Sequence, residues 1–184
     1  WARSLSDRTL LAIVVTHHHP DHVGGAVYFS QQLGLPLWGH AATAALLPDL
    51  SFARHLNDGE VIDLDGPTPQ RWHCMHTPGH APGHICLYER EQRVAVVGDM
   101  VASEGTIVIG PDGELSDYLE QLERLAALDA AVALPAHGAP IDEPTKLFQH
   151  YVRHRMMREG KVVAALRVVG DAGGDLDELV AHAY

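Results

Sequence analysis

Four histidines and an aspartate fall within seven consecutive residues, and this segment constrains the fold more than any other part of the chain. Residues 16–22 have the sequence THHHPDH and directly follow an apolar run, residues 10–15. Such a run is typical of a buried strand. The segment would then lie at the C-terminal end of that strand, where open α/β sheets place their ligand sites. The sequence therefore predicts an α/β protein that is built around a metal site.

The spacing within this segment favours two cations over one. On an extended loop, His17 and His19 point the same way and can share one cation. Asp21 and His22 follow the rigid Pro20 and turn in another direction, which suits a second cation nearby. The alternative is a surface histidine cluster or an affinity tag. A tag would be a terminal homopolymer, whereas this run is interrupted and joined to a core strand.

Size and composition indicate one protein domain with a real core. The chain has 184 residues, of which 46% are hydrophobic, and contains no apolar stretch of membrane-spanning length. Cys74 and Cys86 lie inside predicted strands and lack the spacing of a zinc knuckle, so we expect buried free thiols. Without a disulfide framework and without a secretory signal, we expect a soluble, cytoplasmic protein with no membrane partner.

The net charge of −11 argues against a general polyanion binder, but the charge is unevenly distributed. Residues 146–167 hold six Lys and Arg side chains and a single acid, Glu159. This basic stripe is compatible with a local phosphate-binding face. A solvated helix face is the more common explanation of such a stripe.

Hydrophobic periodicity predicts a βα first half and a β meander in the middle. Helices are expected over residues 26–33, 41–47, from an N-cap at Ser116 to 126, and over 144–169, with a turn at 171–174 and a further helix from 175. A polar loop is expected after residue 47. Strands are expected over residues 10–15, 35–38, 60–64, 71–75, 85–88, 94–97 and 131–134.

Three more ligand candidates lie at the ends of predicted strands. His80 and His84 belong to a Pro- and Gly-rich loop at residues 77–84, Asp99 follows Gly98, and His137 follows the strand at 131–134. Taken singly, an Asp after Gly is usually a turn residue, and an isolated His is usually a group whose hydrogen bonds are satisfied. Their common position at strand ends links them to the first cluster.

These motifs, taken in order, resemble those of the metallo-β-lactamase superfamily hydrolases, and the resemblance covers nearly the whole chain. It implies an αββα sandwich of the metallo-β-lactamase type. His84 matches a loop histidine that is ordinarily outside the ligand set, and His18, His40, His73 and His76 match no ligand position. The resemblance implies a first metal held by His17, His19 and His80, a second held by Asp21, His22 and His137, and a bridging Asp99.

The chemistry of these side chains supports that implied assignment. Imidazole and carboxylate ligands suit Zn²⁺, two per chain, with iron or manganese as alternatives. Two neighbouring cations lower the pKa of a bridging water to near neutrality, so that a hydroxide serves as the nucleophile. Asp21 is the candidate catalytic residue, because it could orient the hydroxide or accept its proton.

Differences from the general family pattern narrow the choice among the branches of the family. Lactamases with Cys at the Asp99 position do not match, and flavodiiron proteins usually carry Glu in place of His19. The bridging aspartate is similar to that of glyoxalase II thioesterases. Residues 105–106, 135–138 and 151–159 resemble the lactamase-beta-like protein 2 branch, which includes single-strand endoribonucleases and acyl-carrier-protein thioesterases.

The same resemblance suggests a substrate-binding patch and a domain boundary. His154, Arg155 and Arg158 could face a substrate phosphate of RNA or phosphopantetheine, or could form a structural salt-bridge cluster with Glu159. We expect a catalytic domain at residues 1–143 and a helical, winged-helix-like C-terminal region at 144–184. The family normally has several strands before the histidine motif, so we also expect an N-terminally incomplete domain from a longer protein.

Three functions remain open from the sequence. The leading one is a metal-dependent hydrolase of a thioester, ester or phosphodiester, with a small or carrier-borne acyl substrate favoured over single-stranded RNA. The second is a mononuclear iron persulfide dioxygenase, which shares the histidine motif. The third is an inactive binding module, against which an intact set of seven ligands argues. The oligomeric state is open, with a homodimer as one option.

Overall fold

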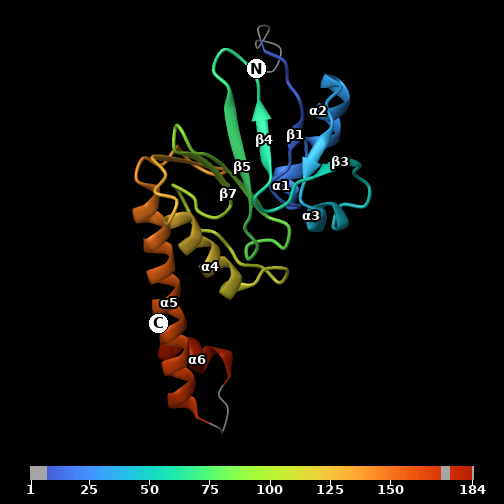
Figure 1. Cartoon of the computed structure of the whole chain (residues 1–184). Helices are drawn as coiled ribbons and strands as arrows, with labels where there is room; N and C mark the ends of the chain where they lie inside the picture. Colours follow the sequence, from blue (N-terminus) through green and yellow to red (C-terminus); the bar gives the residue numbers. More distant parts are fainter. Residues whose placement is uncertain (1–7, 171–174, 184) are drawn as a thin grey trace.

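Two β-sheets form the centre of the molecule in this computed structural model, which describes residues 8–170 and 175–183 (Figure 1). The three-stranded sheet is parallel, in the order β1 (Ile13–Val14), β2 (Leu37–Gly39) and β3 (Phe52–His55). The five-stranded sheet is antiparallel except for its last pair, which is parallel. Its order is β4 (Val61–Leu64), β5 (Gln70–His76), β6 (Ile85–Glu89), β7 (Val94–Gly98) and β8 (Val132–Pro135).

Helices lie beside both sheets. Near the three-stranded sheet lie α1 (Pro20–Val23), α2 (Ala26–Leu33) and α3 (Ala41–Ala45) (Figure 1). Against the five-stranded sheet pack α4 (Leu115–Ala126) and the first half of α5 (Pro144–Val169). The second half of α5 extends away from the body, and α6 (Leu176–Ala183) packs on it. This arrangement confirms the predicted mixed α/β class with small C-terminal helices.

The five-stranded sheet buries both of its faces, which makes the fold a sandwich. Alternate residues of a strand point to opposite faces. On β5 and β6, Met75 and Cys86 therefore join the larger core with Tyr118 of α4, Phe148 of α5 and their neighbours. Cys74 and Ile85 point the other way and join a smaller core, which also contacts side chains of the three-stranded sheet, Val14 and Trp38.

The predicted elements are found, with three differences. Residues 20–23 form the short helix α1 instead of a loop, because Pro20 at its first turn favours helical φ. Residues 52–55 form the edge strand β3 instead of a polar loop; its burial alternates only between exposed and half-buried, so the pattern is weak. The cap of α4 is Glu114 and not Ser116, since the Glu114 carboxylate accepts a hydrogen bond from the Ser116 backbone N–H.

Of the other boundaries, the strand predicted at 10–15 is shortened to the two residues of β1, and the helix predicted at 41–47 ends at Ala45. The predicted helices at 26–33 and 144–169 have the bounds of α2 and α5, and α2 ends at Gly34 in the left-handed conformation, with φ 65°. The predicted turn at 171–174 lies outside the described residues. Within the described residues, no helix combines the length and the apolar character that crossing a membrane requires. The division of the chain between residues 143 and 144 stays a prediction.

Both cysteines are free and buried, as predicted. Burial raises the pKa of the Cys74 thiol and of the Cys86 thiol to about 12. The Cys86 thiol also contacts the Val97 carbonyl oxygen at 3.6 Å and Thr77 Oγ1 at 3.4 Å. The reactive thiolate form is therefore scarce at neutral pH.

We predict that neither thiol reacts with 5,5′-dithiobis(2-nitrobenzoate) at pH 8 in the native protein, because burial limits both thiolate formation and reagent access. Two thiols per chain should react promptly after unfolding in guanidinium chloride, which serves as the control. Fast release of one equivalent of thionitrobenzoate from the native protein would contradict the packing described for β5 and β6.

Candidate metal centre

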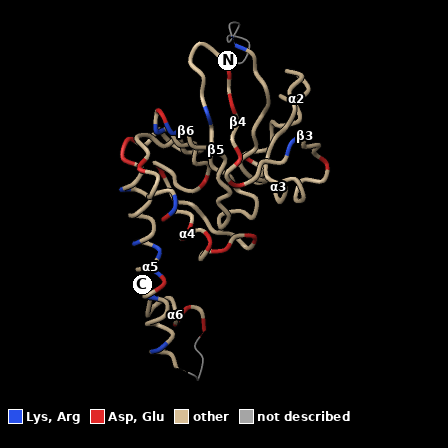
Figure 2. The backbone as a smooth tube through the Cα atoms, viewed as in Figure 1, with Lys and Arg blue, Asp and Glu red and all other residues tan. Residues whose placement is uncertain are grey.

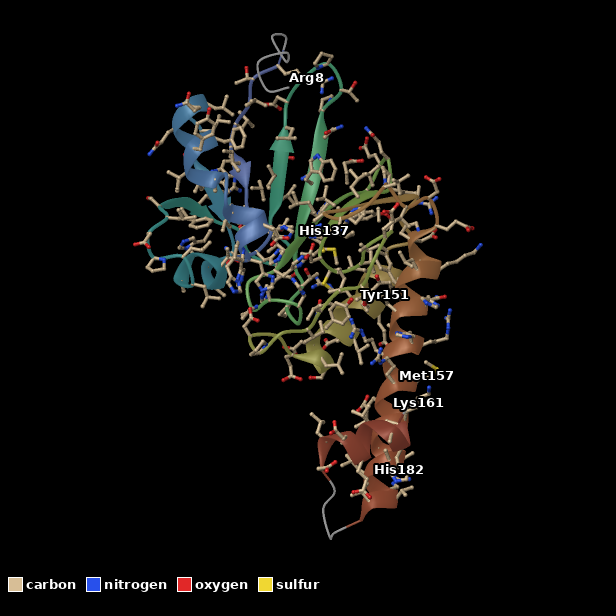
Figure 3. All side chains as sticks on the ribbon, turned by 180° about the vertical axis from the view of Figure 1, so that it is seen from behind. Arg8, His137, Tyr151, Met157, Lys161 and His182 are labelled. Carbon is tan, nitrogen blue, oxygen red and sulfur yellow. The ribbon has the colours of Figure 1, made fainter. Side chains whose placement is uncertain are left out.

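The structure brings together all seven side chains that the sequence singled out as ligands. His17 and His19 follow β1, Asp21 and His22 lie on α1, and the remaining three come from the other sheet. His80 lies on the loop between β5 and β6, Asp99 directly follows β7, and His137 follows β8. Figure 3 shows His137 in the middle of the molecule, away from the projecting end of α5. Strand ends from both sheets thus converge on one place.

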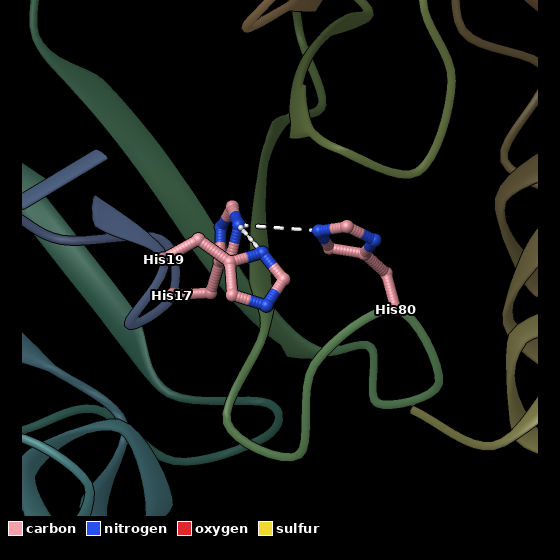
Figure 4. A group of neighbouring side chains, drawn as sticks. All are labelled: His17, His19 and His80. Carbon is pink, nitrogen blue, oxygen red and sulfur yellow. Dashed lines mark hydrogen bonds between the residues drawn. The ribbon is translucent and has the colours of Figure 1, made fainter. Parts of the chain in front are cut away.

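The first group consists of His17, His19 and His80 (Figure 4). His17 Nε2 lies 3.0 Å from His19 Nδ1 and 3.3 Å from His80 Nε2. These nitrogens point toward one another from two separate loops. None of them needs another of them as its hydrogen-bond partner. Three imidazole nitrogens this close together could hold one metal ion.

The outward nitrogens of the same rings are all engaged, and this determines which nitrogen faces the centre. Backbone carbonyls and ionised carboxylates only accept hydrogen bonds, so the rings of His19 and His80 donate outward. Their inward nitrogens then carry lone pairs, which is the arrangement that metal binding needs. The outward partners are Thr16 Oγ1 for His17 Nδ1 at 3.1 Å, Asp112 Oδ2 for His19 Nε2 at 3.2 Å and the Val108 carbonyl for His80 Nδ1 at 2.9 Å.

The second group consists of Asp21, His22 and His137. Asp21 Oδ2 lies 3.4 Å from His22 Nε2 and 3.3 Å from His137 Nε2. Two of these three side chains are open to solvent, since Asp21 and His137 are 57% and 48% exposed. A cation at this position would therefore be reached from outside, whereas the buried His17 side lies deeper.

Asp99 lies between the two groups. Its Oδ2 atom is 3.4 Å from His22 Nε2, 3.6 Å from His137 Nε2 and 3.5 Å from His80 Nε2. Among the described residues, Asp99 Oδ1 and His22 Nε2 are buried atoms without a hydrogen-bond partner. Unpaired buried polar atoms are costly. The donor set and these unpaired atoms fit a site for cations.

The electrostatics of His17, His80 and Asp99 favour the protonation states that bind metals. Burial, followed by the neighbouring rings, lowers the pKa of His17, and burial also lowers the pKa of His80. Both rings are therefore neutral at pH 7. Burial alone would raise the pKa of Asp99, but the surrounding histidines outweigh it and the net pKa is lowered. Burial would lower the pKa of His22, yet nearby Asp99 and Asp21 raise it, so this side of the centre attracts positive charge.

His84 holds the backbone of Asp99 and has no nitrogen left for a cation. Its Nε2 accepts a hydrogen bond from the Asp99 backbone N–H at 3.0 Å, and its Nδ1 lies 2.7 Å from Thr77 Oγ1. Burial lowers the pKa of His84 to about 3, so the ring stays neutral. Gly98 has a φ of 48°, and a Cβ there would lie 2.5 Å from His84 Nε2, so glycine is required for this contact.

Asp112 is a residue of this centre that the sequence did not single out. It lies on the loop between β7 and α4, and its Oδ2 atom is 3.2 Å from His19 Nε2 and 3.1 Å from His18 Nε2. Asp112 is 93 positions from His19 in the chain. An isolated Asp between Pro111 and Gly113 has the signature of a turn, so nothing local indicates this contact.

A cavity of about 490 Å³ opens over both groups. Among its lining residues none is Lys or Arg, while Asp21, Asp99 and Glu104 are acidic. Part of its wall is apolar, with Pro20, Ala102, Ile107 and Val108. The segment from Ala102 to Val108, with Ser103 excepted, supplies one side of the cavity. The cavity can therefore take a small, partly apolar group to the centre.

The three α5 residues predicted to bind substrate do not line this cavity. His154 is exposed, and its ring stacks on His150 with centroids 6.1 Å apart. Arg158 is exposed. The Arg155 guanidinium donates a hydrogen bond to the Ile107 carbonyl, on the outer side of the cavity wall. Figure 2 shows that Lys and Arg are concentrated along α5, and the role of these three residues stays a prediction.

Comparison with known proteins gives consistent matches. The family model of the metallo-beta-lactamase superfamily matches residues 1–137. The beta-lactamase-like protein 2 homolog of Caenorhabditis elegans is 30% identical over 159 residues, which are 84% of this chain and 51% of that protein. The atrochrysone carboxyl ACP thioesterase of Aspergillus fumigatus is 30% identical over 169 residues, which are 88% of this chain and 51% of that protein. The chain spans about half the length of these curated relatives.

Solved structures agree with the sequence relatives. A metallo-beta-lactamase family protein from Thermus thermophilus superposes with a TM-score of 0.72 and 26% identity, over 95% of this chain and 69% of that one. The fold, the order of the motifs and the converging histidines and aspartates are thus shared with one group of generally hydrolytic, metal-binding proteins. This chain belongs to the metallo-beta-lactamase superfamily.

Proposed function

We propose that this chain is a dinuclear metal hydrolase that cleaves an acyl thioester or ester, with a carrier-borne acyl group as its preferred substrate. His17, His19 and His80 would hold the first cation, and the second would be held by Asp21, His22 and His137. Asp99 would be shared between them. The observation that carries the proposal is the position of Asp99 Oδ2, within 3.6 Å of ring nitrogens from both groups.

Zn²⁺ suits this donor set best. Imidazole nitrogen and carboxylate oxygen are its usual ligands, and it binds in an open site without redox chemistry. When bound, the two cations would lower the pKa of a water molecule between them and polarise the scissile carbonyl. Asp21 is exposed and borders the cavity, and in this proposal its carboxylate would accept the proton of the attacking water.

The cavity supports an acyl substrate over RNA. A polyanionic strand would meet Glu104 and no Lys or Arg among the lining residues, so its backbone would be repelled at the entrance. An acyl chain would instead meet the apolar side of the wall, at Ile107 and its neighbours. The name of the Aspergillus fumigatus relative, a carboxyl ACP thioesterase, agrees with this preference.

Metal analysis and a substrate panel test the proposal. We expect the purified chain to bind two equivalents of Zn²⁺ in a titration. We also expect it to hydrolyse acyl-carrier thioesters or S-acyl glutathione at least about 10-fold faster than single-stranded RNA or a chromogenic cephalosporin. One iron per chain with oxygen uptake on glutathione persulfide would overturn the proposal in favour of a dioxygenase. Preferential cleavage of RNA would overturn the substrate class alone.

Replacement of the shared carboxylate is predicted to remove the second cation. Asp99→Ala should lower Zn²⁺ stoichiometry from two to one or none and decrease kcat by at least about 100-fold, because a ligand is lost on both sides. Asp63→Ala is the matched control, since Asp63 is an exposed β4 carboxylate paired with Arg71. Full activity and two bound Zn²⁺ in Asp99→Ala would show that Asp99 is not shared.

Asp112 is predicted to set the orientation of His19. Asp112→Ala removes the acceptor for His19 Nε2, and loss of such an outer contact typically weakens metal binding by about 10–100-fold. Asp112→Asn keeps an oxygen acceptor and should have a smaller effect. Chelator competition measures the Zn²⁺ affinity, with the exposed α4 residue Asp117→Ala as the control. Equal affinities in all four proteins would rule out this role.

A further inference from the structure

The wall of the cavity has little structure of its own. Residues 102–108 form neither helix nor strand, although they make up one side of the cavity. They lie between β7 and α4, and their positions must be set by contacts from elsewhere. Loops of this kind are the mobile part of most sites unless a rigid element holds them.

The rigid element is α5, which contacts the wall at two points. Tyr151 lies where α5 meets the body (Figure 3), and its hydroxyl is 3.4 Å from the Ala102 nitrogen and 3.3 Å from the Ala102 oxygen. One helical turn later, Arg155 donates a hydrogen bond to the Ile107 carbonyl. Residues four apart share one face of a helix, so these two side chains fix both ends of the wall from the same face of α5.

Arg155 is itself held in place by packing. Its Cζ atom lies 5.7 Å from the centre of the Tyr118 ring, close enough for a cation–π contact. Tyr118 is fully buried, and its hydroxyl donates a hydrogen bond to the Met100 carbonyl at 2.7 Å. The guanidinium is therefore fixed between a core tyrosine and the wall, and it does not extend freely into solvent as a surface arginine would.

The contact at Ile107 extends to the metal centre through the next residue. The Val108 carbonyl accepts the hydrogen bond from His80 Nδ1 at 2.9 Å. The Ile107 carbonyl lies in the peptide plane that ends at the Val108 Cα atom, so fixing this plane fixes the point from which the Val108 carbonyl departs and leaves only the φ and ψ of Val108 to set its direction. His80 Nε2, on the opposite side of the ring, lies 3.3 Å from His17 Nε2. Two hydrogen bonds and one peptide link thus connect Arg155 to the ring that carries a candidate ligand nitrogen.

We propose that Arg155 is a positioning residue, which fixes the cavity wall and through the Val108 carbonyl the orientation of His80. Arg155 lies outside residues 1–137, the part that the family model matches, so the proposal gives α5 a role in shaping the centre. The proposal rests on the metal-binding role of His80 proposed above. It assigns Arg155 to the protein scaffold in place of the predicted contact with a substrate phosphate.

Two substitutions separate this role from general structural damage. Arg155→Met keeps an apolar stem over Tyr118 and removes every donor, while Arg155→Lys keeps one donor for the Ile107 carbonyl. Arg153→Ala is the matched control, because Arg153 is an exposed arginine on the same helix, outside the cavity. Thermal melting of the full-length variants would monitor the fold, and Arg155→Lys keeps the test valid if Arg155→Met melts early.

The first readout is Zn²⁺ affinity by chelator competition. We expect Arg155→Met to lower the affinity for one of the two Zn²⁺ ions by about 10-fold. Arg155→Lys should restore most of this affinity, and Arg153→Ala should bind Zn²⁺ as the wild type does. A second readout uses the metal-free protein, in which the His80 Nδ1 proton should exchange with solvent faster in Arg155→Met than in the wild type. Unchanged affinity and unchanged exchange would overturn the proposal.

Kinetics distinguish positioning from substrate contact. A positioning role predicts that Arg155→Met lowers kcat about 10-fold on both S-acyl glutathione and an acyl thioester of phosphopantetheine, with little change in KM. An increase in KM for the phosphate-bearing substrate alone, with normal Zn²⁺ affinity, would instead assign Arg155 to substrate binding. A wild-type chain that binds no Zn²⁺ would refute the proposed function itself. Two tightly bound Zn²⁺ ions in both the wild type and Arg155→Met would refute only this inference.

Discussion

The whole arrangement depends on one buried carboxylate. Asp99 Oδ2 lies within 3.6 Å of ring nitrogens on His22, His80 and His137, which come from three different parts of the chain. A buried carboxylate needs compensating positive charge. The surrounding histidines supply part of it, since they lower the pKa of Asp99, and Asp99 together with Asp21 raises the pKa of His22. Cations between these side chains would take over that role, with neutral rings as their ligands.

The rest of the fold can be understood as support for that carboxylate and the rings around it. The two sheets place His17 and Asp99 at adjacent strand ends, and His84 fixes the Asp99 backbone from behind. A second layer of contacts then orients each ring, from the Thr16 hydroxyl, the Asp112 carboxylate and the Val108 carbonyl. The inferred role of Arg155 adds a third layer, in which a helix beyond the family-matched segment stabilises the cavity wall.

The sequence singled out the seven side chains that the structure brings together, but it did not indicate most of the residues that contact them. His17 and His19 form a local pattern whose spacing carries the chemistry. The distant His80, Asp99 and His137 were indicated by their positions at strand ends, and the family resemblance implied which metal each would hold. Asp112 and Val108 lie 93 and 28 positions from the rings they contact, and neither has a local signature. The position of Arg155 on a helix was predicted, but its carbonyl partner at Ile107 depends on how α5 packs, which periodicity does not determine.

Anomalous diffraction at the zinc absorption edge, from crystals grown with Zn²⁺, tests the central claim most directly. Two peaks are predicted on either side of Asp99 Oδ2, one among His17, His19 and His80 and the other among Asp21, His22 and His137. A single peak in the first group, or a peak between His18 and Asp112 with none beside Asp99, would contradict a shared, dinuclear centre.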